Sequence, residues 1–240
     1  MISVKTTTPT IRKGALFVAD AHFPHHGDAF IKLLRQMYEF EYLCQQLFLM
    51  GDNFDLLFGY NDYITGYVSE AIDLINGIAE KTEVYYFEGN HDFCLKPLFP
   101  NVTVFPYAEQ PSHFLFREKV VALAHGDRYD VPLRYRLYTY WLRKKMTLTL
   151  LRPWQKKIID AQLEHLRAKE ICHEIDGFDE KVKRIMTHYR SRADLVLEGH
   201  FHQRRIIGRY YSLPSLACHG EITIAKEDGL HFIPWQAWLY

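Results

Sequence analysis

The sequence predicts an α/β fold whose functional site lies where several strands end. The first half alternates short apolar runs, which are typical of buried strands, with segments whose apolar residues recur at helical spacing. The second half begins with two apolar runs joined by a short polar turn, as expected of an antiparallel pair. Five of the expected strands end at a cluster of Asp, Asn or His. Strands that end in this way bring such side chains to one edge of a sheet, where open α/β sheets build their sites.

Three strands and two helices are expected in the first half. The strands are the apolar runs 15–19, 46–50 and 84–87. The helices are 30–42 and 67–79, in which apolar residues recur every three or four positions. Each helix should therefore bury one face against the sheet.

The second half combines strands with a long segment that lacks strand character. That segment, 131–189, is expected to form a helical cap inserted in a single domain that spans residues 1–240. A chain of this length can bury the core of one full domain. The expected strands of this half are 114–116, 120–124, 195–198, 206–211, 221–225 and 231–233.

The composition is that of an ordinary globular protein, with 48% apolar and 24% charged residues. A formal net charge of zero argues against a nucleic-acid partner bound by bulk electrostatics. The N-terminus lacks a signal peptide, and no apolar run approaches the ~20 residues that span a bilayer. We therefore expect a cytoplasmic protein that is soluble or bound only peripherally to the inner face of the cytoplasmic membrane. The sequence makes no prediction of oligomeric state.

Four cysteines are scattered along the chain, at positions 44, 94, 172 and 218. They form no CxxC pair and show no regular spacing. In a cytosolic protein such cysteines are normally reduced, so the expectation is four free thiols.

Five short blocks carry the polar clusters: DAH at 20–22, GDNFD at 51–55, GNHD at 89–92, HGD at 125–127 and GHFH at 199–202. Each block alone is a weak signal, because Asp-x-His occurs by chance and Gly-Asn is common in turns. In this order they resemble the signature of the calcineurin-like metallophosphoesterase superfamily, which reads D-x-H, GD-x-x-D, GNH[DE], a His-bearing strand end and GH-x-H. The resemblance frames residues 15 to about 225 and implies a four-layer αββα sandwich.

The resemblance also implies a set of metal ligands. Carboxylate, imidazole and amide groups without thiolate suit manganese, iron or zinc, and an oxygen-rich set favours manganese, with magnesium as a further alternative. Seven groups imply two metal ions that share a ligand. Matched block by block, one ion would be held by Asp20, His22 and His202, the other by Asn90, His125 and His200, and Asp52 would bridge them. Both the DAH and the GHFH pairs are expected to lie in extended segments, where alternate residues point the same way.

The GNHD block supplies the expected catalytic and substrate-binding residues. By resemblance, Asn90 and His91 contact the phosphate, and His91 can protonate the leaving oxygen because imidazole titrates near neutral pH. Asp92 is expected to be catalytic by orienting His91, and Asp55 to support the loop of Asp52, with turn capping as the alternative for both carboxylates.

The segment between HGD and GHFH is the most informative about the substrate. It is basic, with ten Lys or Arg and two acidic residues over 131–169, and it is rich in aromatic and aliphatic residues. Such helices can lie on an anionic membrane surface, or cover a site and hold an acyl chain. The alternative is a structural cap whose charged face is merely solvated.

In length, metal blocks and position of the insert, the chain resembles the UDP-2,3-diacylglucosamine hydrolases of lipid A biosynthesis. The resemblance implies an anionic nucleotide-sugar lipid substrate, cleaved at its pyrophosphate to UMP and 2,3-diacylglucosamine 1-phosphate. One departure stands out, because those hydrolases carry Arg where this chain has His91.

Two other functions stay open at the level of sequence. A soluble phosphomonoesterase or nucleotide phosphodiesterase of the same superfamily would share every metal block. A non-catalytic scaffold is the other alternative, although scaffolds usually lose metal ligands and all seven are present here.

Overall fold

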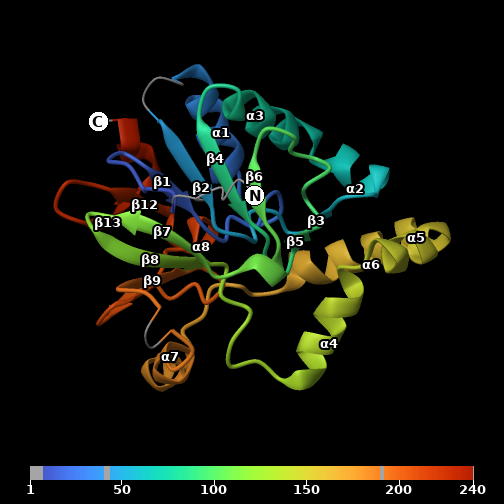
Figure 1. Cartoon of the computed structure of the whole chain (residues 1–240). Helices are drawn as coiled ribbons and strands as arrows, with labels where there is room; N and C mark the ends of the chain where they lie inside the picture. Colours follow the sequence, from blue (N-terminus) through green and yellow to red (C-terminus); the bar gives the residue numbers. More distant parts are fainter. Residues whose placement is uncertain (1–7, 41–43, 190–191, 240) are drawn as a thin grey trace, which may run out of the picture.

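The computed structural model of the chain describes residues 8–40, 44–189 and 192–239. Two sheets form its centre (Figure 1). The six-stranded sheet has the order β13 (Leu230–Pro234), β12 (Glu221–Ala225), β1 (Leu16–Val18), β2 (Gln46–Leu49), β4 (Glu83–Phe87), β6 (Thr103–Phe105). Its strands β1, β2, β4 and β6 run parallel, so that their carboxyl ends share one edge.

The five-stranded sheet has the order β10 (Arg205–Ile207), β11 (Tyr210–Ser212), β9 (Leu195–Glu198), β8 (Lys119–Ala124), β7 (Ser112–Phe116). Strands β8, β9 and β11 run parallel, and β7 pairs antiparallel with β8, as the two apolar runs predicted. A small parallel pair, β3 (Leu57–Phe58) and β5 (Asp92–Phe93), lies beside the large sheets and was not predicted.

Alternate side chains of a strand pack on opposite faces of its sheet and so belong to different layers of the core. Leu16 and Val18 of β1 belong to a core that includes α1 (Ala29–Glu39) and α3 (Ser69–Ala79). Phe17, between them, faces the other sheet instead and stacks on Phe48 with ring centroids 4.5 Å apart. This alternation follows from the two-residue repeat of a strand and lets a strand be buried on both faces.

The outer face of the five-stranded sheet is covered by α7 (Phe178–Met186). Its Val182 and Ile185 pack with Ala122 of β8 and Val196 of β9. In Figure 1, α1 and α3 therefore lie on one side of the paired sheets and α7 on the other. The predicted α/β sandwich, with the layer order αββα, is confirmed.

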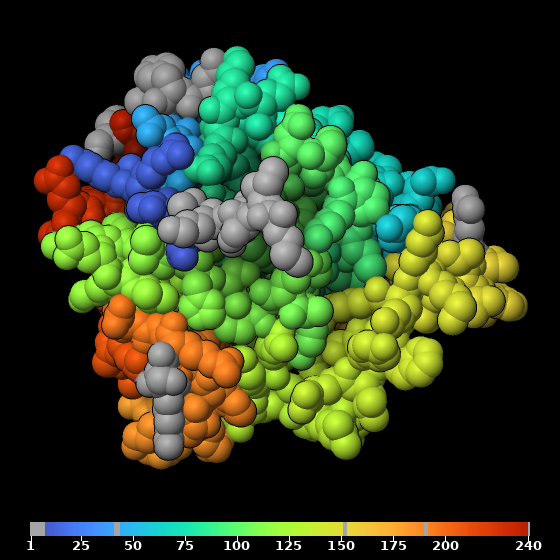
Figure 2. All heavy atoms as spheres, in the orientation of Figure 1, coloured from blue at the N-terminus to red at the C-terminus, as the bar shows by residue number. Residues whose placement is uncertain are grey.

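Three further helices project from one side of the sandwich as a helical lobe: α4 (Leu133–Leu142), α5 (Lys145–Leu151) and α6 (Gln155–Ala168), with the 3₁₀ turn η3 (Arg152–Trp154) (Figures 1 and 2). The lobe packs Leu148 and Ile159 against Phe58, Phe93 and the short helix α2 (Asp62–Tyr67). The segment predicted as one helical cap thus has two parts, because α7 packs on the sheet rather than with the lobe.

The boundaries of several elements differ from those predicted. The first helix ends at Glu39, and the predicted end at Tyr42 lies outside the described residues. The predicted strand 206–211 is two strands, β10 and β11, turned at Gly208, whose φ of +60° suits glycine. The remaining short elements are η2 (Tyr107–Glu109), α8 (Leu216–His219) and η4 (Trp235–Leu239). Among the described helices, none combines the length and apolar composition needed to cross a bilayer.

Candidate metal centre

The predicted ligands follow five strands that come from both sheets. In the six-stranded sheet, Asp20 follows β1, Asp52 follows β2 and Asn90 follows β4; in the five-stranded sheet, His125 follows β8 and His200 follows β9. The parallel strands of each sheet direct these ends to one common edge. Two clusters of possible metal ligands form there.

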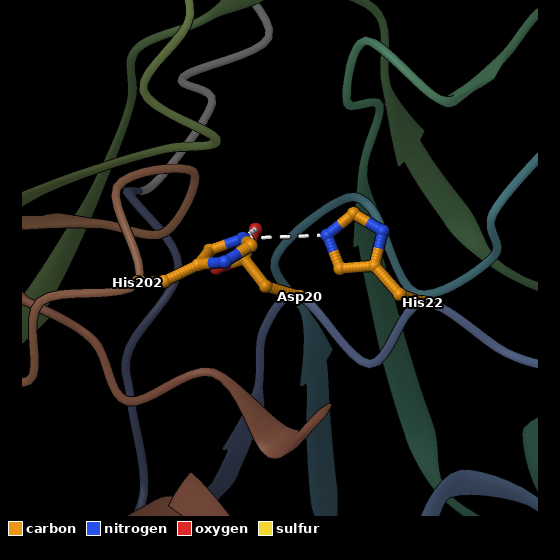
Figure 3. A group of neighbouring side chains, drawn as sticks. All are labelled: Asp20, His22 and His202. Atoms are coloured by element: carbon orange, nitrogen blue, oxygen red, sulfur yellow. Dashed lines mark hydrogen bonds and ion pairs between the residues drawn. The ribbon is translucent and has the colours of Figure 1, made fainter. Parts of the chain in front are cut away.

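The first cluster comprises Asp20, His22 and His202, whose ligand atoms all lie within 4.8 Å of one another (Figure 3). The Nε2 atoms of the two histidines are 3.3 Å apart, and Nε2 of His202 is 3.4 Å from Oδ1 of Asp20. All three side chains are nearly inaccessible to solvent. Imidazole nitrogens and a carboxylate oxygen that converge in this way can share one cation.

The second cluster comprises Asp52, His125 and His200. Nε2 of His125 lies 3.3 Å from Oδ2 of Asp52 and 3.2 Å from Oδ1 of Asn90. The amide oxygen of Asn90 therefore lies close enough to be a fourth metal ligand of this cluster. Together the two clusters contain all seven residues that the sequence predicted.

Backbone carbonyl groups fix the orientation of two of the imidazoles. Nδ1 of His125 lies 3.0 Å from the carbonyl oxygen of Met50, and Nδ1 of His202 lies 2.9 Å from that of Ile171. A carbonyl can only accept, so in both rings the Nδ1–H donates and Nε2 is the nitrogen left to face a metal ion. In metal-binding histidines the ring nitrogen that does not bind the metal typically donates a hydrogen bond of this kind to a carbonyl or carboxylate oxygen. The donor set and its orientation therefore fit a divalent metal ion.

The backbone at the ligands is unusual. Asp20, His22, Asp52, His200 and His202 all have φ between +45° and +64°. The expectation that the DAH and GHFH pairs lie in extended segments is therefore wrong. Non-glycine residues in the left-handed region cost on the order of 1–3 kcal/mol each and cluster at functional sites. Here these left-handed residues follow the strand ends that carry the two clusters.

Two glycines let the strand ends come close together. A Cβ atom at Gly51 would collide with the ring of His125, and one at Gly89 would collide with the carboxylate of Asp52. The glycines of the GDNFD and GNHD blocks therefore have a steric reason to be there, since no other residue leaves room for the ligands.

Asp92 does not orient His91, contrary to the prediction. Its Oδ1 accepts the backbone N–H groups of Asp52 and Gly89, and its Oδ2 accepts that of Asn53 and the hydroxyl of Tyr86. A carboxylate offers about four acceptor sites, and these four donors fill them. Asp92 thus holds the loop that presents Asp52, which is a structural role.

His91 is oriented by a different group. Its Nδ1 lies 2.8 Å from the carbonyl oxygen of Asp55, so its Nε2 faces the second cluster, 3.9 Å from Oδ2 of Asp52. Its backbone N–H donates to Oδ1 of Asp52 over 2.8 Å. The ring lines the space beside both clusters, where a substrate can reach it.

The side chain of Asp55 supports the first cluster instead of the loop of Asp52. Oδ1 of Asp55 is 3.6 Å from Nδ1 of His22, and its Oδ2 accepts the backbone N–H of His25 and contacts the His25 ring at 2.8 Å. His26 approaches the same carboxylate, at 3.7 Å. The two histidines after the DAH block thus surround Asp55, an arrangement that sequence reasoning did not predict.

Burial and neighbouring side chains shift the pKa values of Asp52 and His200 in the second cluster. Burial alone would raise the pKa of Asp52, but the neighbouring His125 and His91 imidazoles outweigh it and hold the pKa well below its usual range. Burial, with the nearby His125, lowers the pKa of His200 to about 4. At neutral pH Asp52 is therefore ionised and His200 is neutral, which are the forms that bind metals.

Two cavities adjoin the clusters. A cleft of about 260 Å³ is lined by His22, Asp52, His200 and His202, with Lys169 and Lys181 among the other residues at its wall. A cavity of about 290 Å³ lies between the sandwich and the helical lobe. Asn90, His91 and Lys169 line both spaces, so the second cavity opens beside the metal cleft.

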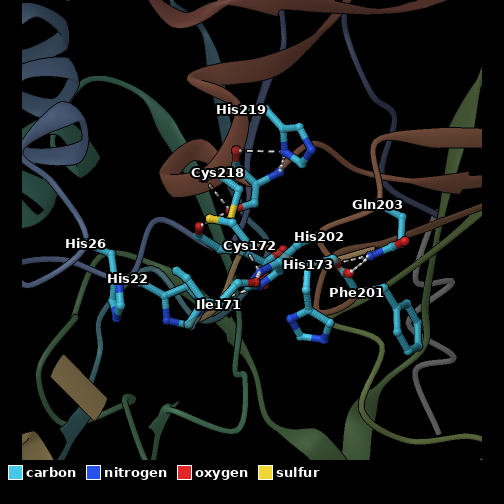
Figure 4. Close-up of a disulfide and its surroundings, with 12 residues drawn as sticks. His22, His26, Ile171, Cys172, His173, Phe201, His202, Gln203, Cys218 and His219 are labelled. Atoms are coloured by element: carbon cyan, nitrogen blue, oxygen red, sulfur yellow. Dashed lines mark hydrogen bonds and ion pairs between the residues drawn. A yellow bond between two sulfur atoms is a disulfide. The ribbon is translucent and has the colours of Figure 1, made fainter. Parts of the chain in front are cut away.

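The cysteine prediction is wrong for two of the four residues. Cys172 and Cys218 form a disulfide with Cα atoms 5.4 Å apart, whereas Cys44 and Cys94 are free (Figure 4). No pattern in the sequence indicates this pair, because 46 positions separate the two cysteines and only the fold brings them together.

Comparisons with known proteins agree with the geometry. No family model matches the chain. Curated proteins named UDP-2,3-diacylglucosamine hydrolase do: one from Coxiella burnetii is 26% identical over 205 residues, covering 80% of this chain and 81% of that protein. Those from Azotobacter vinelandii and Vibrio cholerae are 25% and 24% identical, covering 92% and 87% of this chain and 98% and 94% of those proteins.

Among solved structures, a protein of unknown function from Aquifex aeolicus matches 85% of this chain and 90% of its own, at 15% identity and a TM-score of 0.43, too low to support a conclusion. The family resemblance predicted from the five sequence blocks is confirmed by the curated relatives. Over most of its length this chain is similar to the UDP-2,3-diacylglucosamine hydrolases, a family of the metallophosphoesterase superfamily.

Proposed function

We propose that the protein is a metal-dependent hydrolase with two metal ions, which cleaves UDP-2,3-diacylglucosamine to UMP and 2,3-diacylglucosamine 1-phosphate. The main support is one juxtaposition: two Asp/His clusters lie at a shared edge, and an apolar cavity opens beside them. The names of the curated relatives support the same substrate.

One ion would be held by Asp20, His22 and His202, the other by Asn90, His125 and His200, and Asp52 would bridge them. Support for the bridge comes from the two oxygens of Asp52. Oδ1 accepts the backbone N–H of His91, while Oδ2 faces His125 and the cleft. Manganese is the favoured metal, with iron, zinc or magnesium as alternatives. When bound, the pair of ions supplies a hydroxide at neutral pH and neutralises charge on the phosphoryl oxygens.

The chain's own residues would position the phosphoryl group and manage a proton. Asn90 and His91 line the cleft and contact the phosphate. With Nδ1–H bound to the carbonyl of Asp55, the protonated ring of His91 presents Nε2–H to the departing oxygen. In the reaction water adds to phosphorus, the phosphoanhydride P–O bond breaks, and the departing phosphate leaves with the proton.

The cavity between sandwich and lobe suits an acyl chain. Phe58 and Phe93 form its wall on the sandwich side, and Leu142, Ile158 and Ile159 form its wall on the lobe side. Its volume of about 290 Å³ is close to the lower end of the ~300–1,000 Å³ range of small-molecule sites. The lobe would thus be a lid that holds an acyl chain while the diphosphate lies at the metals.

The proposal predicts that the protein with Mn²⁺ releases UMP from UDP-2,3-diacylglucosamine and leaves UDP-N-acetylglucosamine, which has no long acyl chain, nearly untouched. Ile158→Glu places a charge at the cavity wall and is expected to raise KM roughly tenfold or more with little change in kcat, since losing an apolar contact costs about 1–3 kcal/mol. Mass spectrometry of the products measures both reactions.

Ile206→Glu is the matched control, because Ile206 is an exposed apolar residue on β10, outside the cavity. Turnover of a simple phosphomonoester such as p-nitrophenyl phosphate, without release of UMP, would refute the lipid substrate. It would favour a soluble phosphomonoesterase, for which the open cleft and the His91 in place of Arg give some support.

The helical lobe also has the surface expected of a protein that meets its substrate at a membrane. Large apolar side chains on it are exposed, among them Leu137, Trp141, Leu150 and Trp154, each at more than half of its full accessible area. Exposed cations such as Lys144 lie among them. Apolar side chains enter the interface of a bilayer while lysine and arginine attract anionic lipids.

Vesicles of anionic phospholipid should therefore sediment the protein, and the Leu137→Glu/Trp141→Glu variant should bind them at least roughly tenfold more weakly, since burying one large apolar side chain contributes about 1.5–3 kcal/mol. Ile206→Glu again serves as the control and should bind normally. Equal sedimentation of all three proteins would show that the lobe is a structural cap with a solvated charged face.

A further inference from the structure

The disulfide lies directly beside the first metal cluster. Cys172 belongs to the segment between α6 and α7, and Cys218 belongs to α8. Sγ of Cys218 is 3.7 Å from Nδ1 of His202 (Figure 4). Cys172 is exposed, so a small thiol or a protein dithiol can reach the bond.

One end of the disulfide holds the segment that orients His202. The carbonyl of Ile171, the residue before Cys172, accepts from Nδ1 of His202. The neighbouring Gln203 donates to the carbonyl of His173 and accepts the backbone N–H of Ile175, each over 3.0 Å. Residues 169–175 have no regular secondary structure, so their position depends on these bonds, on the disulfide, on the buried side chain of Ile171 and on the packing of Ile175 against α7.

The other end holds the helix that orients Asp20. The hydroxyl of Ser215 donates to the backbone carbonyl of Asp20 over 2.8 Å and accepts the backbone N–H of Cys218 over 3.1 Å. The N–H of Ala217 also donates to the carbonyl of Asp20. The disulfide therefore joins the segment behind one ligand of the first cluster to the helix behind another.

Of the second cluster, only His200 approaches this arrangement, because its backbone N–H donates to the carboxylate of Asp20. The other ligands of that cluster have no such connection. His125 is oriented by the carbonyl of Met50 and by Gln110, whose side chain accepts its backbone N–H. Asp52 is held by the N–H of His91 and by the carboxylate of Asp92. These partners lie just after β2, at the start of β5 and just before β7, all remote in sequence from the disulfide.

We propose that the thiol–disulfide state of Cys172 and Cys218 sets the metal affinity of the first cluster and leaves that of the second nearly unchanged. The inference rests on the proposed function only in that both clusters bind a divalent metal. In the reductive step a dithiol gives two electrons and two protons: its sulfurs form a disulfide, the Cys172–Cys218 bond breaks, and both cysteines become thiols. The freed segment would then hold His202 less firmly. Losing a partner that orients a metal ligand typically lowers affinity about 10–100-fold.

The test compares Mn²⁺ binding by the oxidised protein and by protein reduced with a phosphine and freed of it anaerobically by gel filtration. Competition with a chelator gives the affinities, and electron paramagnetic resonance distinguishes a coupled ion pair from a single ion. The oxidised protein should bind two ions, with two free thiols per unfolded chain. The reduced protein, with four, should bind one ion with unchanged affinity and the other about 10–100-fold more weakly.

Two variants give the matched controls. Cys172→Ser/Cys218→Ser should behave like the reduced protein and ignore the reductant. Cys44→Ser/Cys94→Ser, which keeps only the disulfide pair, should respond to the reductant as the original chain does. Reoxidation should restore the coupled pair of ions in this second variant.

Several outcomes would overturn the inference. Two ions bound equally well in both states would refute it and leave the proposed function intact, as would equal weakening of both sites, which indicates a general loss of stability. Four free thiols in the oxidised protein would refute it as well. Failure to bind Mn²⁺ in either state would refute both proposals.

Discussion

Replacing Asp52 with asparagine is expected to remove metal from both clusters and to lower kcat/KM more than about 100-fold. Oδ1 of Asp52 accepts the N–H of His91, and Oδ2 lies 3.3 Å from Nε2 of His125. An amide NH₂ in place of either oxygen would face a donor or a metal ion, and the bridging charge would be lost. Even outer partners of metal ligands are typically worth 10–100-fold, so a bridging ligand should exceed that range.

Metal content by mass spectrometry and release of UMP measure this effect together. Asp73→Asn is the matched control, because Asp73 is an exposed carboxylate on α3, away from the cleft. Retention of one tightly bound ion in Asp52→Asn would contradict the bridge and would indicate that Asp52 serves only the second cluster.

The second large effect is expected for His91→Ala, which should lower kcat roughly 10²–10⁴-fold while both metal ions stay bound. The hydrogen bond from His91 to Asp52 is made by its backbone N–H, which alanine keeps. Only the ring, held by the carbonyl of Asp55 beside the cleft, is removed. The loss should therefore appear as a lost proton donor rather than as a lost metal.

Steady-state kinetics with metal analysis separate these cases, and added imidazole should restore part of the rate. His231→Ala, which removes an imidazole paired with Asp228 at the far end of the six-stranded sheet, should leave kcat unchanged. A His91→Ala enzyme with normal kcat and a raised KM would assign the ring to phosphate binding alone.

Much of the fold could be predicted because the strands are dense apolar runs. The sequence placed β12 at its observed bounds, and β2 and β4 within one residue, since buried strands leave little ambiguity in pattern. The ligands were predictable for another reason: they follow the ends of strands, and the carboxyl ends of parallel strands lie at one edge of a sheet. The sequence shows which residue types could bind a metal ion, and the two sheets bring those residues close together.

What could not be predicted depends on partners remote in sequence or on the backbone. Two of the four donors of Asp92 belong to Asp52 and Asn53, which are 40 and 39 positions away, so a local reading paired it with its neighbour His91 instead. The left-handed turns at the ligands have no consistent glycine signal, because Asp and His adopt them here. The amphipathic pattern of α7 indicates that one face of the helix is buried. It does not indicate that this face packs on the sheet rather than against the lobe.

The first cluster takes its ligands from the two ends of the chain, with 180 positions between the contacting side chains of His22 and His202. During synthesis the N-terminal pair Asp20 and His22 therefore leaves the ribosome long before its partner exists. Domains acquire their long-range contacts only as the late segments emerge. A nascent chain that ends before His202 would lack one ligand of the first cluster, so the proposed metal ion could be held there only after that late segment has emerged.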